Sequence, residues 1–395
     1  MLRRLAADPH PDVRAALASN EAAPVECFAV LASDPAVGVV VSVAGNPRAP
    51  GDVLSRLAGS DEENVRVAVA QNPTTPRDVV PRLAKDRATD VRLAVCRRES
   101  LPDVLFDRLA GDRELSVREA VALRRDLNHT VCGRLARDRE ATVRAIMAGN
   151  PAAPAAVLAR LSEDDEVDVR LGASGNECTP AESLDRLSRD ADLRLRVVVA
   201  GNRATPLNAL ARLGEEPDAT CRVAVARNHA TPPEALDRLS SDADIEVRLG
   251  VASNSGAPSA VLHRLSTADE RTRRRVAANA GTPVATYAAL ARDPSGDVRF
   301  HLAKNAAVPA EVLLVLADDD DADVRRAVLS HASVPPAVRE RESQRLIRLA
   351  TDPATDPYAL VYLAGHEDER VHAAVLANGS YVADLPPRGP RTMRD

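Results

Sequence analysis

The sequence predicts an all-α fold, an α-solenoid of about fifteen two-helix repeats, each about 26 residues long. Two observations carry this prediction. A Val-Arg pair, or a close variant of it, recurs every 26 residues along nearly the whole chain. Most copies have a Pro at a fixed distance after this pair and then apolar residues at helical spacing. A fixed period of this length indicates an array of stacked supersecondary units rather than one compact core.

The first residue of the pair marks the opening position of each repeat. It falls with unchanged spacing at Val13, Val39, Val65, Val91, Val117, Val143, Val169, Leu195, Cys221 and Val247. The register then loses one residue, to Thr272, and continues through Val298 to Val324. A shorter step of 21 residues leads to a degenerate copy near Arg345, and Val371 opens the last copy.

Residues that end and begin helices recur within the repeat. An Asn lies seven residues after the opening position in most copies, from Asn20 to Asn378. Asn tolerates the left-handed conformation that ends a helix, and its side chain can tie down a turn. Four residues later comes Pro, often after Thr, which predicts a Thr N-cap followed by Pro as the first helical residue. Pairs such as Leu236 and Leu239 then form the apolar stripe of a second helix of two to three turns.

Charged residues recur at two further positions. An Arg follows the opening residue, as Arg66 does, and an Asp lies five residues before the next opening position, as Asp86 does. The Asp can cap the following helix or pair with the Arg of a neighbouring repeat. Because the two residues recur at matching phases, we favour an ion-pair ladder between repeats over an Arg stripe that binds nucleic acid.

The recurring pattern DxxVRxxVAxNPxTPxxxLxxLA resembles the bacterial leucine-rich repeat variant family and, more distantly, HEAT-type helical repeats. This resemblance covers roughly residues 1–380. It implies a right-handed α-solenoid in which an α-helix alternates with a shorter helix, often of the 3₁₀ type, and it implies no particular function. Some family members resemble iron–sulfur proteins through a Cys cluster before the repeats, but this chain has no such cluster.

The period defines the expected domain organisation. We expect a single repeat domain over residues 1–378, with an irregular segment at about 335–348 that we interpret as a longer, charged helix. Residues 379–395 contain three Pro and three Arg, and they are expected to form a disordered tail.

Composition narrows the function classes. The net charge is −6 and aromatic residues make up only 2%, which argues against dedicated nucleic-acid binding through bulk charge or base stacking. The chain has no apolar run long enough to span a membrane and no signal peptide, so we expect a cytoplasmic protein. The five Cys fall at different phases of different repeats, which excludes a shared metal site and fits buried thiols in a reducing compartment.

Residues 91–131 break the rules of the repeat. The Asn position is occupied by Arg98 and, one repeat later, by Arg124, and each has a second Arg beside it, Arg97 and Arg125. Stacking would bring these four side chains together, with His129 nearby. We predict a binding patch here because local rules tend to fail at functional sites. Drift of a degenerate repeat is the alternative.

A second basic cluster lies where the register slips. Arg271, Arg273, Arg274 and Arg275 follow one another on one predicted helix and cannot all face the same way. We include Arg271, Arg274 and Arg275 in the predicted partner-binding set. The alternative is an ordinary solvated surface.

No motif for catalysis, phosphate binding or metal binding occurs, so we expect no enzyme activity, no catalytic residue, no cofactor and no metal. We expect a monomeric scaffold that binds a protein or peptide partner, with no membrane partner, along its curved surface. The alternative is a nucleic-acid-binding HEAT-like solenoid that uses the same Arg residues. A third hypothesis is a spacer whose ends make the contacts, including the helix that carries Tyr358 and Tyr362.

Overall fold

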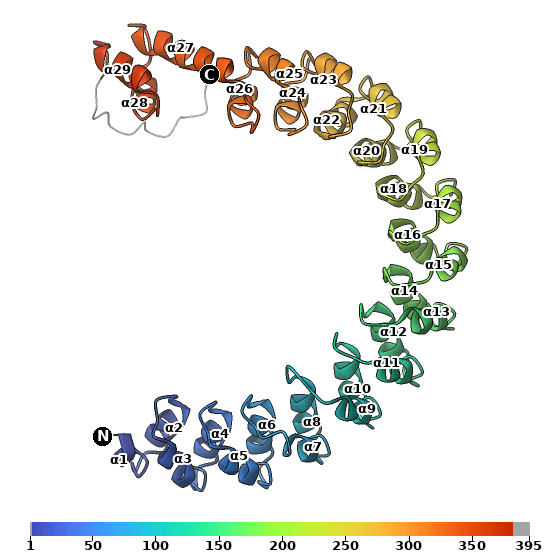
Figure 1. Ribbon diagram of the computed structural model, residues 1–395, viewed down its shortest axis with the longest axis vertical. Coiled ribbons are helices and arrows are strands. Elements are labelled where there is room, and N and C mark those ends of the chain that lie inside the picture. The colour runs from blue at the N-terminus through green and yellow to red at the C-terminus, as the bar shows by residue number, and fades with distance from the viewer. Residues whose placement is uncertain (1, 382–395) are drawn as a thin grey trace, which may run out of the picture. The chain divides into compact units, whose positions relative to one another are not determined.

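The computed structural model describes residues 2–381, and in this part of the chain every regular element is a helix (Figure 1). The chain divides into two compact units, residues 1–230 (unit 1) and residues 231–395 (unit 2). Most of the tail predicted over residues 379–395 lies outside the described residues. The predicted all-α repeat architecture is confirmed, since long and short helices alternate through each unit.

Unit 1 consists of two rows of helices. The long-helix row contains α2 (Pro11–Ser19), α4 (Val37–Gly45), α6 (Glu63–Gln71), α8 (Thr89–Cys96), α10 (Leu115–Ala122), α12 (Ala141–Gly149), α14 (Val167–Gly175), α16 (Leu193–Gly201) and α18 (Ala219–Arg227). The short-helix row contains α1 (Leu2–Leu5), α3 (Val25–Leu31), α5 (Gly51–Leu57), α7 (Val80–Leu83), α9 (Asp103–Leu109), α11 (His129–Leu135), α13 (Ala155–Leu161), α15 (Ala181–Leu187) and α17 (Leu207–Leu213).

Unit 2 continues the alternation up to one irregular helix. Its long helices are α20 (Ile245–Ser253), α22 (Glu270–Ala278), α24 (Gly296–Ala303), α26 (Ala322–Leu329) and α29 (Glu369–Ala377). Its short helices are α19 (Pro233–Leu239), α21 (Ser259–Leu265), α23 (Val284–Leu290), α25 (Ala310–Leu316) and α28 (Pro357–Ala364). The predicted longer, charged helix is present as α27 (Pro336–Thr351), which runs without interruption for 16 residues.

The short helices are α-helices rather than 3₁₀-helices. In α5, the backbone N–H of Leu54 donates to the carbonyl of Pro50 at 3.0 Å, and that of Ala58 donates to Leu54 at 2.9 Å. Each of these bonds spans four residues, as α-helical bonds do. The sequence left the helix type open, and the backbone bonds decide it.

The core lies between the two rows and is built from Val, Leu and Ala. In unit 1, Val65 and Val69 of α6 and Leu54 of α5 are almost fully buried. A small residue five positions after the opening position, such as Ala70, is buried between successive long helices. Because small residues let the backbones approach closely, long helices pack more tightly on one another than short helices do, which bends each stack toward its long-helix side.

The recurring Asn joins each repeat to the one before it. Asn72 Nδ2 donates to the carbonyls of Ala44, at 2.7 Å, and of Asn46, at 2.8 Å, while its Oδ1 accepts from the Thr74 N–H at 3.0 Å. Asn46, Asn150, Asn176, Asn202, Asn228, Asn279, Asn305 and Asn378 make the same two backward bonds. We call this series the Asn ladder.

The backbone of the Asn is not left-handed, so that prediction is wrong. Asn72 has φ −65° and ψ 123°, an extended conformation. A left-handed residue is useful when a helix must satisfy its own last carbonyls. Here a side chain of the next repeat satisfies one of them, since Arg98 Nη1 donates to the Ala70 carbonyl. The Thr hydroxyl satisfies another, since Thr75 Oγ1 donates to the Val69 carbonyl at 2.6 Å. The predicted role of the Asn side chain in holding a turn is confirmed by its bond to Thr74.

The Thr-Pro step is also shifted by one residue from the prediction. The N-cap of α15 is Pro180, with φ −58° and ψ 143°, and Thr179 lies before it. Thr179 does not cap α15, because its hydroxyl reaches back to the Ala173 carbonyl at 2.6 Å. Pro suits this N-cap because its φ is fixed near the required value and its missing N–H is not needed there.

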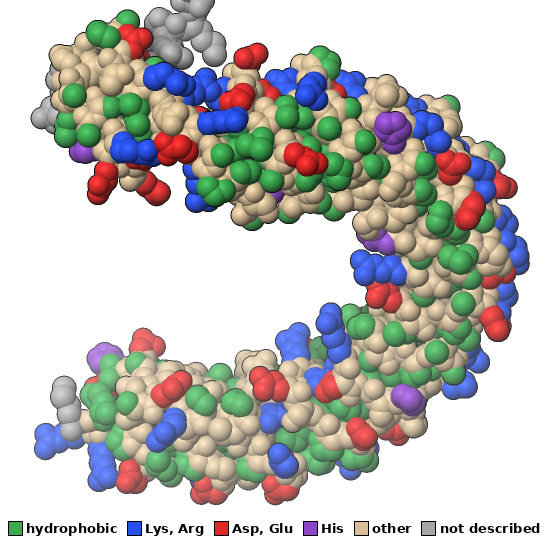
Figure 2. Space-filling model, turned by 45° about the horizontal axis from the view of Figure 1, so that its top comes forward, with side chains coloured by type: hydrophobic (Ala, Val, Ile, Leu, Met, Phe, Trp, Pro, Cys, Tyr) green, Lys and Arg blue, Asp and Glu red, His purple; other side chains and the backbone are tan. Residues whose placement is uncertain are grey.

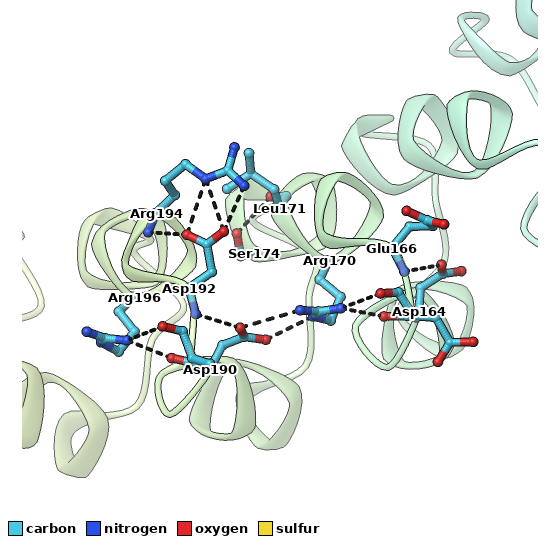
Figure 3. A network of polar contacts seen from close by, with 11 residues as sticks. Asp164, Glu166, Arg170, Leu171, Ser174, Asp190, Asp192, Arg194 and Arg196 are labelled. Carbon is cyan, nitrogen blue, oxygen red and sulfur yellow. Dashed lines mark hydrogen bonds and ion pairs between the residues drawn. The ribbon is translucent and has the colours of Figure 1, made fainter.

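The predicted Arg–Asp ladder is present, and Figure 3 shows part of it. Arg170 Nη1 donates to the carbonyls of Asp164, at 2.8 Å, and Asp165, at 3.0 Å, in the loop before its own helix. Its Nε and Nη2 donate to the carboxylate of Asp190, before the next long helix, at 2.9 and 3.4 Å. Asp190 Oδ1 also accepts from the Asp192 N–H at 3.0 Å. One guanidinium thus fixes two loops and their helices.

We call each such Arg–carboxylate contact a rung. The same bidentate rung forms at Arg14–Asp34, Arg66–Asp86, Arg92–Asp112, Arg118–Asp138, Arg144–Asp164, Arg273–Asp293 and Arg299–Asp319. The Asp of a rung is not the N-cap of the next helix, because the N-cap lies two residues after it. Of the two roles predicted for this Asp, pairing with Arg is therefore the general one.

Several rungs depart from the pattern. Val40 takes the place of the Arg in one repeat, and Ser60 takes the place of its Asp, so both partners are absent together. Arg196 faces Glu216 at 3.3 Å, and its buried Nε has no hydrogen-bond partner among the described residues. At the register slip, the Asp269 carboxylate caps α22 by accepting from the Thr272 N–H at 3.0 Å, and it also pairs with Arg248 at 3.4 Å. In that rung the carboxylate fills both predicted roles.

Candidate functional site

The exposed side of the long-helix row in unit 1 is mainly apolar. On each long helix, the positions two and three residues after the opening position are mostly half-buried. We call these positions the unit 1 face: Ala15, Ala16, Val41, Ser42, Val67, Ala68, Leu93, Ala94, Glu119, Ala120, Ala145, Ile146, Leu171, Gly172, Val197, Val198, Val223 and Ala224. Glu119 is the one charged member of this set.

Polar and charged residues border the unit 1 face. Positions just before the opening residue include Asp90 and Arg194, and positions six residues after it include Arg97 and Arg227. In Figure 2, charges of both signs lie among hydrophobic side chains along the visible surface of each unit. An apolar strip with a polar border is the composition of a protein-binding surface.

Gly172 brings two helices of this face unusually close together. A Cβ added at Gly172 would lie 2.9 Å from the Ala145 carbonyl oxygen and 3.0 Å from the Ala148 Cβ. The α12 and α14 backbones therefore touch where other repeats place a side chain.

The equivalent positions in unit 2 are mixed, with charged side chains on α22 and α26 and apolar ones on α20 and α29. α22 presents Arg274 and Arg275 where unit 1 has Val, Leu or Ala. Arg271 pairs with Glu246 at 2.8 Å, and Arg274 pairs with Asp297 at 3.3 Å. Arg275 is exposed, whereas Arg273 forms a ladder rung, so the predicted division of this cluster between different faces is confirmed.

The structure gives Arg98 and Arg124 a definite place in the Asn ladder. Arg98 Nη1 donates to the carbonyls of Ala70, at 2.7 Å, and Asn72, at 2.8 Å. Arg124 Nη1 donates to those of Cys96 and Arg98, both at 2.6 Å. Each Arg thus reaches the same two carbonyls of the previous repeat that an Asn reaches elsewhere. Burial lowers the pKa of Arg98, which fits a guanidinium turned toward the stack.

Arg124 has two further contacts that hold it in place. Its Nη2 lies 2.6 Å from the Asp126 carboxylate, and its guanidinium lies 4.9 Å from the centre of the Phe106 ring. The position of these two Arg at the Asn phase was visible in the sequence. The signal that was missed is that an Arg placed there can donate two bonds from one nitrogen, as an amide does.

The other predicted residues of this patch remain available at the surface. Arg97, Arg125 and His129 are exposed, and within residues 2–381 no ion pair to any of them is present. Arg97 ends α8 and borders the unit 1 face, whereas His129 begins the short helix α11. The predicted patch therefore divides into two half-buried members of the ladder, Arg98 and Arg124, and three exposed side chains.

A groove that sequence reasoning missed lies between α24 and α26 in unit 2. It encloses about 690 Å³, and its floor is made by Phe300, Ala303 and Ala327. Lys304 lies 5.4 Å from the centre of the Phe300 ring, and Arg326 pairs with Asp323 at 2.9 Å. The signal in the sequence was Phe300 itself, the aromatic residue at a face position where unit 1 has smaller side chains.

The thiols lie apart from one another. Cys27, Cys96, Cys132 and Cys221 are buried as predicted, whereas Cys178 is exposed in a turn. Burial raises the pKa of Cys96 and of Cys221 to about 12, so neither is a reactive thiolate. In the described part of the chain, no group of three or more His, Cys, Asp or Glu side chains is arranged to hold a metal ion. No helix in residues 2–381 has the length and apolar character needed to cross a membrane.

No protein-family model and no curated protein matches the sequence. Among solved structures, a leucine-rich repeat variant with a novel repetitive structural motif is 26% identical, with a TM-score of 0.44, covering 56% of this chain and 87% of its own. Yeast importin-beta aligns at 10% identity and a TM-score of 0.34, over 95% of this chain and 60% of its own. A second importin beta structure aligns at 12% identity and a TM-score of 0.31, over 92% and 57%. The chain is an all-α repeat solenoid that resembles leucine-rich repeat variants and, more distantly, HEAT-like solenoids, as its repeat pattern predicts.

Proposed function

We propose that this protein is a non-catalytic scaffold that binds a protein or peptide partner along its long-helix surface, with the unit 1 face as the main contact. The observation that carries the proposal is the series of half-exposed Val, Leu, Ile and Ala side chains on successive long helices. Such a strip offers many shallow apolar contacts, and partners gain most from the few that become fully desolvated.

The exposed cationic side chains favour a partner that carries negative charge. Arg97, Arg125 and Arg275 have guanidinium groups open to a partner's carboxylates, and His129 lies at the surface close to Arg125 in the sequence. Arg271 and Arg274 already pair with acidic side chains and contribute less. Arg98 and Arg124 support the site by holding its backbone. We therefore propose that the partner is acidic at the borders of its apolar contact.

The setting of the function follows from the same features. Four buried free thiols fit a reducing compartment, and we propose a cytoplasmic location. We also propose that the protein acts as a monomer, because each unit has a core of Val, Leu and Ala side chains buried within its own rows.

The proposal is tested by changing the unit 1 face without changing the fold. Tagged protein is purified from its host with and without nuclease, and co-purifying proteins are identified by mass spectrometry. Val197→Glu with Val198→Glu places two charges on the apolar strip, and at least a tenfold loss of the captured partner is expected. Leu207→Glu is the matched control, because Leu207 is 59% exposed on the short helix α17 of the same unit.

Capture that is unchanged by the face variant contradicts the proposal, provided that circular dichroism shows both variants folded. Partners that disappear on nuclease treatment favour instead the alternative of a nucleic-acid-binding solenoid. In that case affinity for a nucleic-acid probe falls steeply as salt is raised, since phosphate contacts release counterions.

A further inference from the structure

The last regular repeat contains a rung with only one of its two partners. In eight rungs, Arg Nη1 is fixed by backbone carbonyls of the preceding loop, and Nε with Nη2 holds a carboxylate at 2.6–3.4 Å. The carboxylate always comes from a residue twenty positions later in the sequence. This repeated geometry is the reference against which the last repeat can be judged.

Arg325 keeps the fixed half of the rung. Its Nη1 donates to the carbonyls of Asp319, at 2.6 Å, and Asp320, at 2.9 Å, as the other ladder Arg do. Within residues 2–381, no carboxylate lies at ion-pair distance from its guanidinium. The residue twenty positions later is Arg345, and it lies inside α27, where a regular repeat has a loop. The edge of Arg325 that should hold a carboxylate is therefore open.

The charged neighbours do not fill this edge. The Asp319 carboxylate is held by Arg299 at 2.6 Å, and that of Asp318 by Arg341 at 3.1 Å. Arg345 adds a positive charge in place of the absent Asp. Arg325 itself is half-buried, so part of its hydration is already lost.

We propose that the open Nε–Nη2 edge of Arg325 is a binding site for a carboxylate of the partner, either an Asp or Glu side chain or a C-terminal carboxylate. This proposal rests on the proposed function and adds to it one defined contact in unit 2. A guanidinium presents parallel N–H donors that match a planar carboxylate, and the two carbonyl bonds hold Arg325 in the orientation that eight rungs use. The Arg325 side chain is thus already ordered in the free protein, so binding of the carboxylate loses little side-chain entropy.

The test uses short peptides, so it does not depend on finding the partner. Full-length protein with ¹⁵N-labelled Arg is titrated with acetyl-Gly-Asp-Gly-amide, which has only a side-chain carboxylate, and with acetyl-Gly-Gly-Gly acid, which has only a terminal one. The Arg325 Nε–H signal, assigned by its loss in Arg325→Gln, is expected to shift saturably with at least one peptide, and the responding peptide identifies the carboxylate source. Acetyl-Gly-Asn-Gly-amide is expected to cause no shift.

Three controls keep the result specific. The Arg299 signal should not move, because Asp319 already occupies its edge. Arg339→Gln removes an exposed charge from α27 and should leave the response intact, whereas Arg325→Lys keeps the charge but removes the fork and should weaken binding at least tenfold. Equal shifts at Arg299 and Arg325, or unchanged binding in Arg325→Lys, would overturn the proposal. Failure of the proposed function is recognised separately, by unchanged capture in the unit 1 face variant.

Discussion

At the scale of single residues, the Asn ladder works because one amide matches three backbone groups. Both N–H groups of Asn72 donate to carbonyls of the previous repeat, and its oxygen accepts from its own turn. No other side chain of this size has two donors and one acceptor in that arrangement. His331 occupies the Asn position of another repeat and replaces the amide only in part. Its Nε2 bonds one carbonyl of the previous repeat, that of Asn305, while its Nδ1 accepts from the Ser333 N–H.

Removal of one ladder amide should cost more than the average hydrogen bond. Asn72→Ala leaves the carbonyls of Ala44 and Asn46 without their donor in a buried place. We expect a loss of about 3 kcal/mol in the free energy of unfolding, since buried unpaired groups lose their hydration as well. Urea unfolding followed by circular dichroism measures it, with Asn64→Ala on the exposed side of α6 as the control. Equal losses in the two variants contradict this role.

The irregular rung at Glu216 offers a stabilising change. Glu is one methylene longer than the Asp of other rungs, and it leaves Arg196 Nε buried without a hydrogen bond. Glu216→Asp should restore the bidentate pairing and raise the free energy of unfolding by about 1 kcal/mol. Thermal unfolding measures the gain, and Glu177→Asp in an exposed turn serves as the control. A lower melting temperature in Glu216→Asp would show that its loop cannot adopt the rung geometry.

The sequence predicts much at this scale but not the direction of every bond. The spacing of Arg66 and Asp86 was enough to predict their rung. The repeat at Asn72 predicted a structural role but not its reach into the previous repeat, because a single period does not show which neighbour a side chain contacts. Arg98 and Arg124 were interpreted as a binding patch, since their donors toward the stacked backbone are visible only once the repeats are placed together.

At the scale of elements, the distance between long helices is set by what lies between them. α12 and α14 approach closely because Gly172 has no side chain to hold them apart. The sequence predicted helices of the right length and order, but it did not reveal this contact, since Gly within a helix usually signals only weaker helix propensity.

Gly172→Ala should therefore reverse the usual effect of this substitution. Ala is favoured over Gly inside a helix by about 1 kcal/mol. The added methyl would lie 2.9 Å from the Ala145 carbonyl oxygen, so we expect a net loss of about 1–3 kcal/mol instead. Gly149→Ala in α12 is the matched control, because its Cβ would meet no atom within 4 Å, and it should be neutral or stabilising. Urea unfolding of the two variants decides between these outcomes.

At the scale of the whole molecule, the rungs make stability depend on pH. Hydrogen bonds from Arg14 hold the pKa of the Asp34 carboxyl below its ordinary value, and Arg144 does the same for Asp164. A depressed pKa in the folded state means that the stabilisation is present above the unfolded pKa, near 4, and is lost as the pH falls through the folded value. Because the rungs repeat, these losses should occur together.

The urea midpoint should be nearly constant from pH 7 to pH 5 and fall steeply below about pH 4. The decline reflects proton uptake by rung carboxylates on unfolding. A variant with Arg144→Gln and Asp164→Asn, which removes one rung at both ends, should show a shallower decline. Identical slopes in the variant and the unchanged protein would show that the acid sensitivity arises outside the rungs.

One repeat has Val40 in place of the Arg and Ser60 in place of the Asp, and this joint replacement suits a gene that changes by whole repeats. Counted from one opening position to the next, the Arg and the Asp of a rung belong to the same copy of the repeat. Duplication or deletion of one copy therefore adds or removes a complete charge pair and leaves no orphan ion. The side chains of the Asn ladder bond only backbone carbonyls of the preceding repeat, and every copy of the repeat has these carbonyls. Unequal recombination can therefore add or remove whole repeats while the contacts between the remaining repeats are kept.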